Sequence, residues 1–321
     1  MGFIKKTAMT KKCFFAIGSL FIFTFSAKSQ TDYDADMMAK NLFCSGISYN
    51  YSSWDHYWEG TLKRTNENLG TVSTQMFAYM GNYGVSKKFN LLFGIPYIKT
   101  KASAGTLQEM KGLQDLSLFA KWMPYSQNLG AGKLSLIGVG GFSLPVGNYT
   151  PDFLPLSIGL RSKTVLVRVM ADYAIGKFFV TGSGTYMHRR NIEIDRQAYY
   201  TTEMHITNEV EMPDASSINL RTGYRTKYLL AEAIVNKLTT LGGFDITRNN
   251  MPFPSNKMNA TTAGFRVKYV PKSFERLSLL ANGDYVVAGR NVGQSTTLGA
   301  SIFYILNFNG RSNTTTNNKT K

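Results

Sequence analysis

Apolar and polar residues alternate with a period of two along most of the chain. In VLVRVMADY, residues 165–173, one face carries three valines while the other carries an arginine and an aspartate. Side chains of a β-strand point alternately to its two faces, so this pattern predicts a strand with one apolar and one polar face. The same alternation recurs in FNLLFGIPYI, residues 89–98, and in FRVKYV, residues 265–270.

The chain contains about twelve such segments, and the connections between them are alternately short and long. Alternating segments of about ten residues, with short turns on one side and long loops on the other, are typical of outer-membrane β-barrels. The sequence therefore predicts an all-β fold, a transmembrane antiparallel up-and-down barrel of about twelve strands. Strand boundaries read from a sequence shift by several residues, and residues 191–215 are long enough to contain another strand, so about ten to fourteen strands are compatible with the pattern. An even count places both ends of the barrel on the periplasmic side. The predicted strands cover residues 42–54, 71–85, 88–100, 113–125, 133–145, 161–175, 177–190, 216–225, 228–238, 260–270, 275–288 and 296–308.

The strands of a secreted soluble β-sandwich would show the same alternation of apolar and polar residues. The positions of aromatic residues distinguish the two folds. In membrane barrels, girdles of aromatic residues flank the apolar band at both membrane interfaces. No segment after residue 29 has the roughly 18 uninterrupted apolar residues of a spanning helix. Backbone groups in lipid have no water to bond, so every strand must pair on both edges and the sheet must close. Tyrosines near the ends of predicted strands favour the membrane barrel: Tyr83, Tyr97, Tyr173, Tyr224, Tyr269 and Tyr285.

The N-terminus has the features of a secretory signal peptide. Four lysines precede the apolar run CFFAIGSLFIFTF, and Ala27-Lys28-Ser29 forms a small-x-small cleavage site after it. We therefore expect export to the outer membrane of a Gram-negative bacterium. The predicted organisation is a signal peptide over residues 1–29, a periplasmic N-terminal segment over 30–41, the barrel over 42–309 and a disordered polar tail over 310–321.

The charge of the exported chain limits its partners. Without residues 1–29 the chain keeps 31 basic and 20 acidic residues, a formal charge of +11. Export excludes nucleic acid as the natural partner, and the basic residues are scattered, which indicates a lined cavity or solvated loops. Cys44 is the single cysteine left, so no intramolecular disulfide can form.

The alternation assigns eleven charged residues to the inner face of the barrel, and seven of them are basic. We expect a polar lumen with net positive charge, which either forms salt bridges that only stiffen the barrel or prefers anionic or amphipathic solutes. The N-terminal segment carries Asp32, Asp34 and Asp36, so it could fold back into this lumen as a plug. The predicted lumen charges are Asp115, Lys121, Arg168, Asp172, Arg189, Arg221, Arg225, Glu232, Arg266, Lys268 and Asp284.

Aromatic residues gather at the predicted outer end of the first strand and in two long loops. SSWDHYWEG, residues 52–60, would place its aromatic side chains at headgroup level or at the mouth of the barrel. Residues 145–159 and 249–259 combine prolines with apolar side chains, a composition that favours collapse of these loops into the mouth. The candidate ligand contacts at the mouth are Trp54, Tyr57, Trp58, Phe153 and Phe253.

The sequence predicts no catalytic site, no metal site and no cofactor. An enzymatic alternative would use His56 or His188 as a base, but Asp55 and His56 point in opposite directions if the strand continues, and no nucleophile elbow is present. The histidines and Cys44 show no ligand spacing. The glycines of GVGG, residues 138–141, are interpreted as places where a strand bends or an object in the lumen approaches.

Several motifs resemble one known group of proteins. NYGVSKKFNLLFGIPYIKTKASAGTL, GLQDLSLFAKW, ADYAIGKFFVTGSGTY and GRNVGQSTTLG resemble the transporter-like outer-membrane barrels named for the MetA pathway of phenol degradation. The similarity is to the branch found in Bacteroidetes, over most of residues 40–308. It implies a barrel of about twelve strands and passage of small, often hydrophobic molecules across the outer membrane.

The leading functional hypothesis is a monomeric outer-membrane transporter or channel for small hydrophobic or anionic solutes. The alternatives are a structural or surface-interaction barrel with a filled lumen and, third, an outer-membrane lipid hydrolase. The expected partners are outer-membrane lipid, a small-molecule solute and the barrel-assembly machinery.

Overall fold

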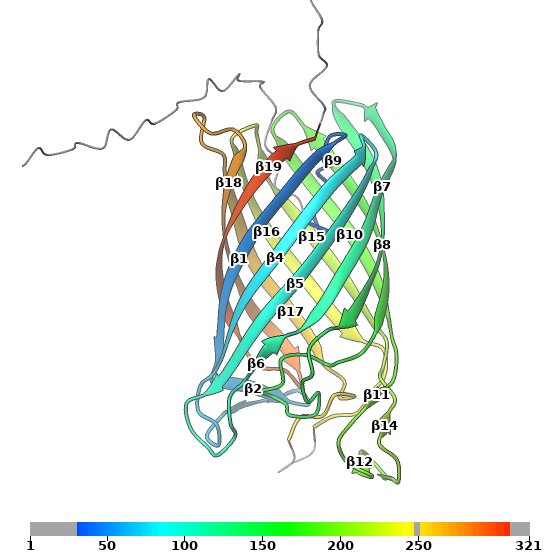
Figure 1. Ribbon diagram of the computed structural model, residues 1–321, viewed down its shortest axis with the longest axis vertical. Helices are drawn as coiled ribbons and strands as arrows, with labels where there is room; N and C mark the ends of the chain where they lie inside the picture. The colour runs from blue at the N-terminus through cyan, green and yellow to red at the C-terminus, as the bar shows by residue number, and fades with distance from the viewer. Residues whose placement is uncertain (1–30, 247–250, 309–321) are drawn as a thin grey trace, which may run out of the picture.

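The computed structural model describes residues 31–246 and 251–308, and these residues form a closed barrel of twelve antiparallel strands (Figure 1). Each long strand pairs with its neighbours in the chain, and the last strand closes on the first. The all-β prediction is therefore confirmed. The strands of the wall are β1 (Leu42–Trp54), β4 (Val72–Ser86), β5 (Phe89–Ala102), β7 (Asp115–Leu129), β8 (Gly132–Pro145), β9 (Thr164–Ile175), β10 (Phe178–Arg189), β15 (Ala215–Arg225), β16 (Leu229–Thr240), β17 (Asn259–Tyr269), β18 (Leu277–Arg290) and β19 (Thr296–Asn307).

Closure satisfies the backbone on both edges of every wall strand. The register between β1 and β19 runs from Leu42 opposite Asn307 to Ser53 opposite Thr296, and β1 pairs along its other edge with β4. No wall strand is left with a free edge in lipid, which is the condition for a sheet to span a membrane. The predicted strand boundaries differ from these by at most four residues, the largest shift being the end of β7.

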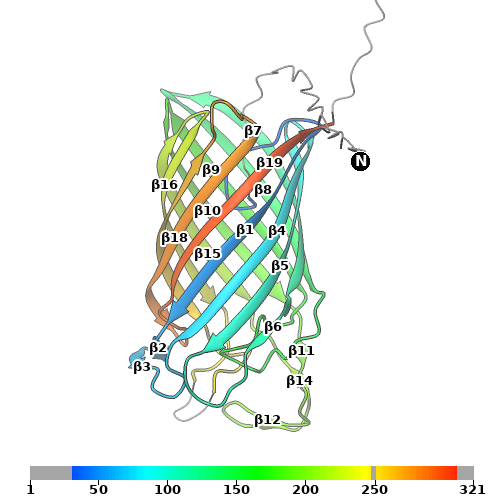
Figure 2. The same ribbon diagram turned by 60° about the vertical axis from the view of Figure 1, so that its left-hand side comes forward.

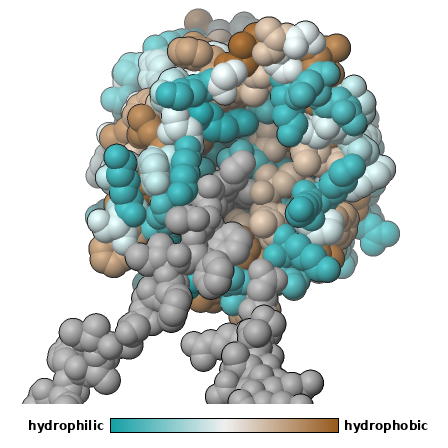
Figure 3. Space-filling model, turned by 90° about the horizontal axis from the view of Figure 1, so that it is seen from above, coloured by the Kyte–Doolittle hydropathy of each residue, from teal (hydrophilic) through white to brown (hydrophobic). Residues whose placement is uncertain are grey.

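Short turns join the strands at one end, and long loops join them at the other, as the sequence pattern predicts. The two-residue turn between β9 and β10 contains Gly176, whose φ of 58° would strain a residue with a side chain. Figure 3 looks onto this short-turn end and shows hydrophilic residues around much of its rim. Both ends of the described barrel lie on this side (Figure 2).

The long loops carry short strands. One of them, β6 (Met110–Leu113), pairs with β5 and extends the wall ahead of β7, whereas the others pair with each other inside the loops. Within residues 190–214 these strands are only two residues long and pair with each other, so that excursion hides no further wall strand. The short strands are β2 (His56–Glu59), β3 (Leu62–Thr65), β6 (Met110–Leu113), β11 (Ile192–Glu193), β12 (Tyr199–Tyr200), β13 (Met204–His205) and β14 (Glu209–Val210).

The two faces of the wall differ as the alternation predicts. Val169 and Ile218 point outward with 66% and 68% of their surface exposed, whereas Arg168, beside Val169, is 1% exposed and faces inward. An outer surface of this kind is stable in lipid, and an inner surface of this kind requires polar partners. Among the described residues, no helix is long and apolar enough to cross a membrane. The predicted signal peptide and polar tail lie outside the described residues, as do Gln30 of the predicted N-terminal segment and Asn309 of the predicted barrel range.

Candidate functional site

The N-terminal segment, residues 31–41, lies inside the barrel and is drawn in dark blue behind the wall (Figure 1). Its three aspartates contact basic side chains from four different wall strands, β7, β9, β15 and β17. Local hydrogen bonds give the segment a tight turn, because the Asp34 carboxylate accepts from the backbone N–H groups of Thr31 and Asp36. The segment therefore presents its carboxylates to several sides of the lumen at once.

Lys121 of β7 binds the turn most closely. Its Nζ lies 3.0 Å from Oδ1 of Asp34 and donates to the backbone carbonyls of Thr31, Asp34 and Asp36 at 3.2, 2.5 and 2.8 Å. The lysine is 0% exposed. A buried ammonium needs both a counter-charge and acceptors for its protons, and the N-terminal segment provides all of these.

Arg168 of β9 holds two residues within that turn, Asp32 and Tyr33. Its Nη1 donates to Oδ2 of Asp32 at 2.9 Å, and its Nε donates to Oγ1 of Thr185 at 2.7 Å. The guanidinium also lies over the ring of Tyr33, 3.6 Å from the ring centroid. One arginine thus contacts both a carboxylate and an aromatic face, which combines a charge-assisted hydrogen bond with a cation–π contact.

Asp36 and Asp172 share a second group of cations. Arg225 Nη1 lies 3.3 Å from Asp172 Oδ2 and 3.8 Å from Asp36 Oδ1, and Lys268 Nζ lies 3.7 Å from Asp36 Oδ2. These contacts connect β9, β15 and β17 through one carboxylate of the segment. The N-terminal segment is therefore part of the electrostatic network of the lumen.

A third group lies within the wall itself. Arg221 Nη1 donates to Oε1 of Glu232 at 3.0 Å, and Arg266 Nη1 is 3.9 Å from the same oxygen. Tyr33 connects this group to the segment, because the Arg221 guanidinium lies 5.8 Å from its ring centroid. Sequence reasoning did not identify Tyr33, since a single tyrosine among aspartates carries no periodic signal.

All eleven predicted lumen charges occupy inward-facing positions of their strands. Asp115 accepts from the Tyr149 hydroxyl at 2.6 Å, which ties the loop before β9 to the lumen. Arg189 ends β10, where its backbone N–H donates to Asp214, and Asp284 lies opposite Gly264. The eleven wall positions carry seven basic and four acidic groups, so the three aspartates of the segment balance their net charge.

The five predicted mouth residues do not form one patch. Trp54 and Tyr57 line a cavity of about 360 Å³, and Phe153 packs beside Trp54 against a buried cluster of loop residues. Trp58 is 8% exposed and lies against Gly289. Phe253 stacks on Tyr199, with 5.2 Å between ring centroids. The structure therefore brings two of the five to a cavity at the long-loop end and places the other three in loop packing.

The condition under which Asp55 and His56 would point in opposite directions, a continuing strand, is not met. β1 ends at Trp54, and the chain then bends into the hairpin of β2 and β3, so the strand does not continue. Asp55 Oδ1 and His56 Nδ1 are 2.7 Å apart, and this hydrogen bond holds the pKa of the Asp55 carboxyl below its usual value. Among the described residues, no hydroxyl group hydrogen-bonds to His56.

The other histidine considered for catalysis also pairs with a carboxylate. His188 Nδ1 lies 3.0 Å from Oδ1 of Asp214. Hydrogen bonds, first of all from the Tyr186 hydroxyl, hold the pKa of Asp214 below its usual value. Within residues 31–246 and 251–308, no group of three histidine, cysteine or acidic side chains is placed to hold a metal ion.

Comparisons with known proteins identify the fold. The chain matches no protein-family model and no curated protein. Among solved structures it is similar to the COG4313 outer membrane channel from Pseudomonas putida F1, with a TM-score of 0.68 and 15% identity over 87% of this chain and 100% of that one. The translocator domain of the autotransporter NalP from Neisseria meningitidis has a TM-score of 0.44 and 12% identity, covering 86% of this chain and 90% of its own. The closed barrel and the similarity to the COG4313 outer membrane channel confirm the predicted outer-membrane β-barrel fold and localisation.

Proposed function

We propose that this outer-membrane barrel is a channel for small solutes that favours anionic and amphipathic ones, and that its N-terminal segment occupies the solute pathway. The observation that carries the proposal is the charge of the lumen. Its wall has an excess of basic groups, and three carboxylates of a terminal segment neutralise that excess. A permanent structural filling would need no separate segment, because wall carboxylates such as Glu232 already pair with arginines inside the barrel.

The contacts of the segment suggest which solutes the lumen accepts. At Arg168 the segment presents a carboxylate and an aromatic ring together. An aromatic carboxylate presents the same two groups, so a small amphipathic anion would satisfy Arg168 in place of Asp32 and Tyr33. Binding at such sites raises the local concentration of anions, and release requires that no single site holds them too tightly.

The similarity to an outer membrane channel supports the same class of function through the fold alone. Within that class, we propose that the chain belongs to the Bacteroidetes branch of the barrels named for the phenol-degradation pathway, as its motifs suggest. The proposal assigns no catalytic step to the barrel, so replacing His56 or His188 with alanine should leave solute flux unchanged.

One observation favours the alternative, a barrel with a filled lumen that conducts nothing. Lys121 and Arg168 are 0% and 1% exposed, so the segment covers both side chains completely. The two functions make different predictions for a barrel whose segment has lost its charges. A displaceable segment would leave an open, basic pathway, whereas a structural filling would leave the barrel closed or less stable.

Solute flux into liposomes separates these functions. The test variant replaces the segment carboxylates with amides of the same shape, Asp32→Asn, Asp34→Asn and Asp36→Asn. The control variant removes the same charge from exposed loop positions, Glu67→Gln, Asp195→Asn and Glu203→Gln.

Gluconate is an anion, sorbitol is neutral and N-methylglucamine is a cation, and the three have similar sizes. Their relative rates of entry therefore report charge selectivity. We expect the segment variant to admit gluconate faster than wild type and faster than the other two solutes, and the control variant to behave like wild type. Absence of flux through folded, heat-modifiable barrels of both variants would support the filled alternative.

A further inference from the structure

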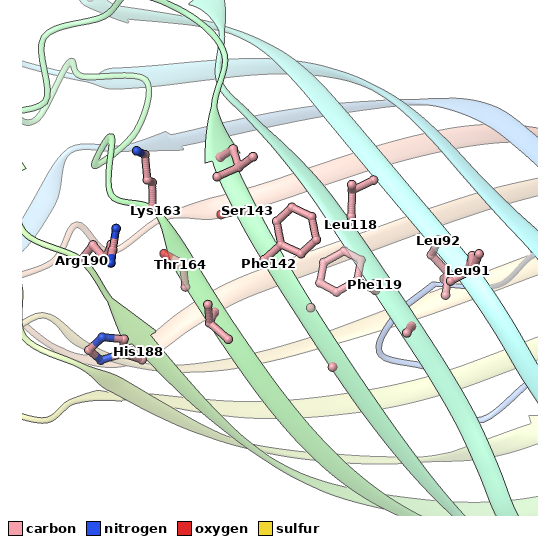
Figure 4. Close-up of a pocket in the computed structure, with 15 residues that line it drawn as sticks. Leu91, Leu92, Leu118, Phe119, Phe142, Ser143, Lys163, Thr164, His188 and Arg190 are labelled. Atoms are coloured by element: carbon pink, nitrogen blue, oxygen red, sulfur yellow. The ribbon is translucent and has the colours of Figure 1, made fainter.

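The outer, lipid-facing wall contains an apolar hollow that the channel function does not use. A cavity of about 790 Å³ opens between β5, β7, β8, β9 and β10, and its lining includes Leu91, Leu118, Gly140, Phe142 and Val165 (Figure 4). Leu91, Phe142 and Val165 are exposed side chains on the outward face of the wall. The hollow therefore faces the membrane.

Small residues create this hollow through the strand register. Ala120 of β7 lies directly opposite Gly140 of β8, so two adjacent outward positions have almost no side chain. A Cβ atom added to Gly140 or to Gly138 would meet no atom within 4 Å. The interpretation of these two glycines as lumen contacts is therefore wrong, because both face outward, whereas Gly141 packs against Phe119.

A basic pair stands at the long-loop end of the hollow. Lys163 and Arg190 both line it. The Arg190 backbone N–H donates to the Lys163 carbonyl at 2.9 Å, so the two side chains leave neighbouring positions just beyond the paired ends of β9 and β10. His188, the next outward residue of β10, lines the same end (Figure 4). Among the described residues neither Lys163 nor Arg190 forms an ion pair, whereas Arg290 at the same end of the barrel pairs with Asp245.

We propose that this hollow binds a phosphorylated, acylated glycolipid of the outer leaflet, the class to which lipid A belongs. The acyl chain lies against Leu91, Phe142 and the small residues, and a phosphate contacts Lys163 and Arg190. The arrangement of the wall gives the lipid one orientation, because the basic pair lies where the long loops leave the membrane and the apolar lining continues away from it. Lysine and arginine side chains without carboxylate partners complement a phosphate, and arginine binds it with two parallel hydrogen bonds.

Lipid binding is measured with purified barrels and lipid A as the probe, by native mass spectrometry or by titration in detergent. The head-group variant is Lys163→Gln with Arg190→Gln. The acyl variant is Gly140→Leu, which puts a side chain into the hollow at a position where an added Cβ atom meets no atom within 4 Å. The control variant removes two exposed cations from the long-loop side of β5 and β6 that do not line the hollow, Lys101→Gln with Lys111→Gln. Heat modifiability on gels shows that each variant is folded.

We expect the head-group variant to weaken binding of lipid A about 30-fold, from the usual contribution of two basic residues to binding an anionic lipid. Gly140→Leu should weaken binding as well, and the control variant should bind like wild type. Wild type should also bind dephosphorylated lipid A as weakly as the head-group variant does. An equal loss of lipid A binding in the control variant would show that surface charge alone attracts the lipid. Unchanged binding of lipid A by Gly140→Leu would show that no acyl chain enters the hollow. Either result would overturn the proposal, and neither depends on whether the barrel conducts.

Discussion

Replacing Lys121 with methionine should release the N-terminal segment from the lumen. Methionine keeps the length and apolar character of the lysine stem but lacks the ammonium that contacts Asp34 and three backbone carbonyls. The Asp34 carboxylate would then stay in the lumen without its cation. The segment would keep its contacts with Arg168, Arg225 and Lys268, so its release is a shift of an equilibrium.

The size of this shift follows from the burial of the pair. Removing one partner of a buried ion pair typically costs about 3–5 kcal/mol, because the remaining charge is left without compensation. Each 1.4 kcal/mol changes an equilibrium constant about tenfold. Lys121→Met should therefore change the ratio of docked to released segment by roughly 100- to 4,000-fold.

Hydrogen exchange measured by mass spectrometry detects the released segment directly. In wild type we expect slow exchange over residues 31–41, and in Lys121→Met exchange close to that of an unstructured peptide. Lys133→Met, at an exposed position near the short-turn end, is the matched control and should exchange like wild type. Equal protection of the segment in wild type and in Lys121→Met would refute the view that Lys121 holds it.

Three further predictions concern the loops and the wall. Hydrogen bonds, first of all from Arg290, hold the pKa of Asp245 below its usual value. This contact should therefore stabilise its loop above about pH 4 and be lost as the pH falls further, whereas Asp245→Asn should abolish this pH dependence of proteolysis in the loop. Val169→Arg should destabilise the barrel in urea by about 2–4 kcal/mol because it places a charge in lipid, and Val169→Leu should not; equal stability of the two would mean that this face is not in lipid. Tyr149→Phe should cost about 1–3 kcal/mol by leaving Asp115 without its donor, seen as faster cleavage of residues 146–163, and an unchanged cleavage rate would contradict this anchoring role.

The sequence predicted the wall well because a barrel in lipid imposes a period of two on each strand. Arg168 lies between two exposed valines, and a charged side chain there is stable only when it faces the lumen. Its inward orientation therefore followed from the alternation of side chains along the strand. The same rule placed all of the predicted charges on the lumen side. Several strands, β7 most of all, end later than predicted because pairing continues beyond the membrane, where no apolar face is required.

The loops and the contacts inside the lumen were less predictable, because tertiary packing decides them. Trp58 looks like an interfacial aromatic in the sequence, yet the turn after Trp54 places it against Gly289, far away in the chain. Gly140 gave no sign of its outward direction until the strand register was known. The pairing of each segment aspartate with its own cation likewise depends on how residues 31–41 enter the barrel.

The reversal potential of reconstituted channels under a salt gradient tests the central claim most directly. A basic lumen whose excess charge is neutralised by the segment should show modest anion selectivity in wild type and stronger anion selectivity when Asp32, Asp34 and Asp36 are changed to asparagine. Cation selectivity in the asparagine variant, or a reversal potential that does not change between the two proteins, would contradict the claim that solutes pass through this basic lumen.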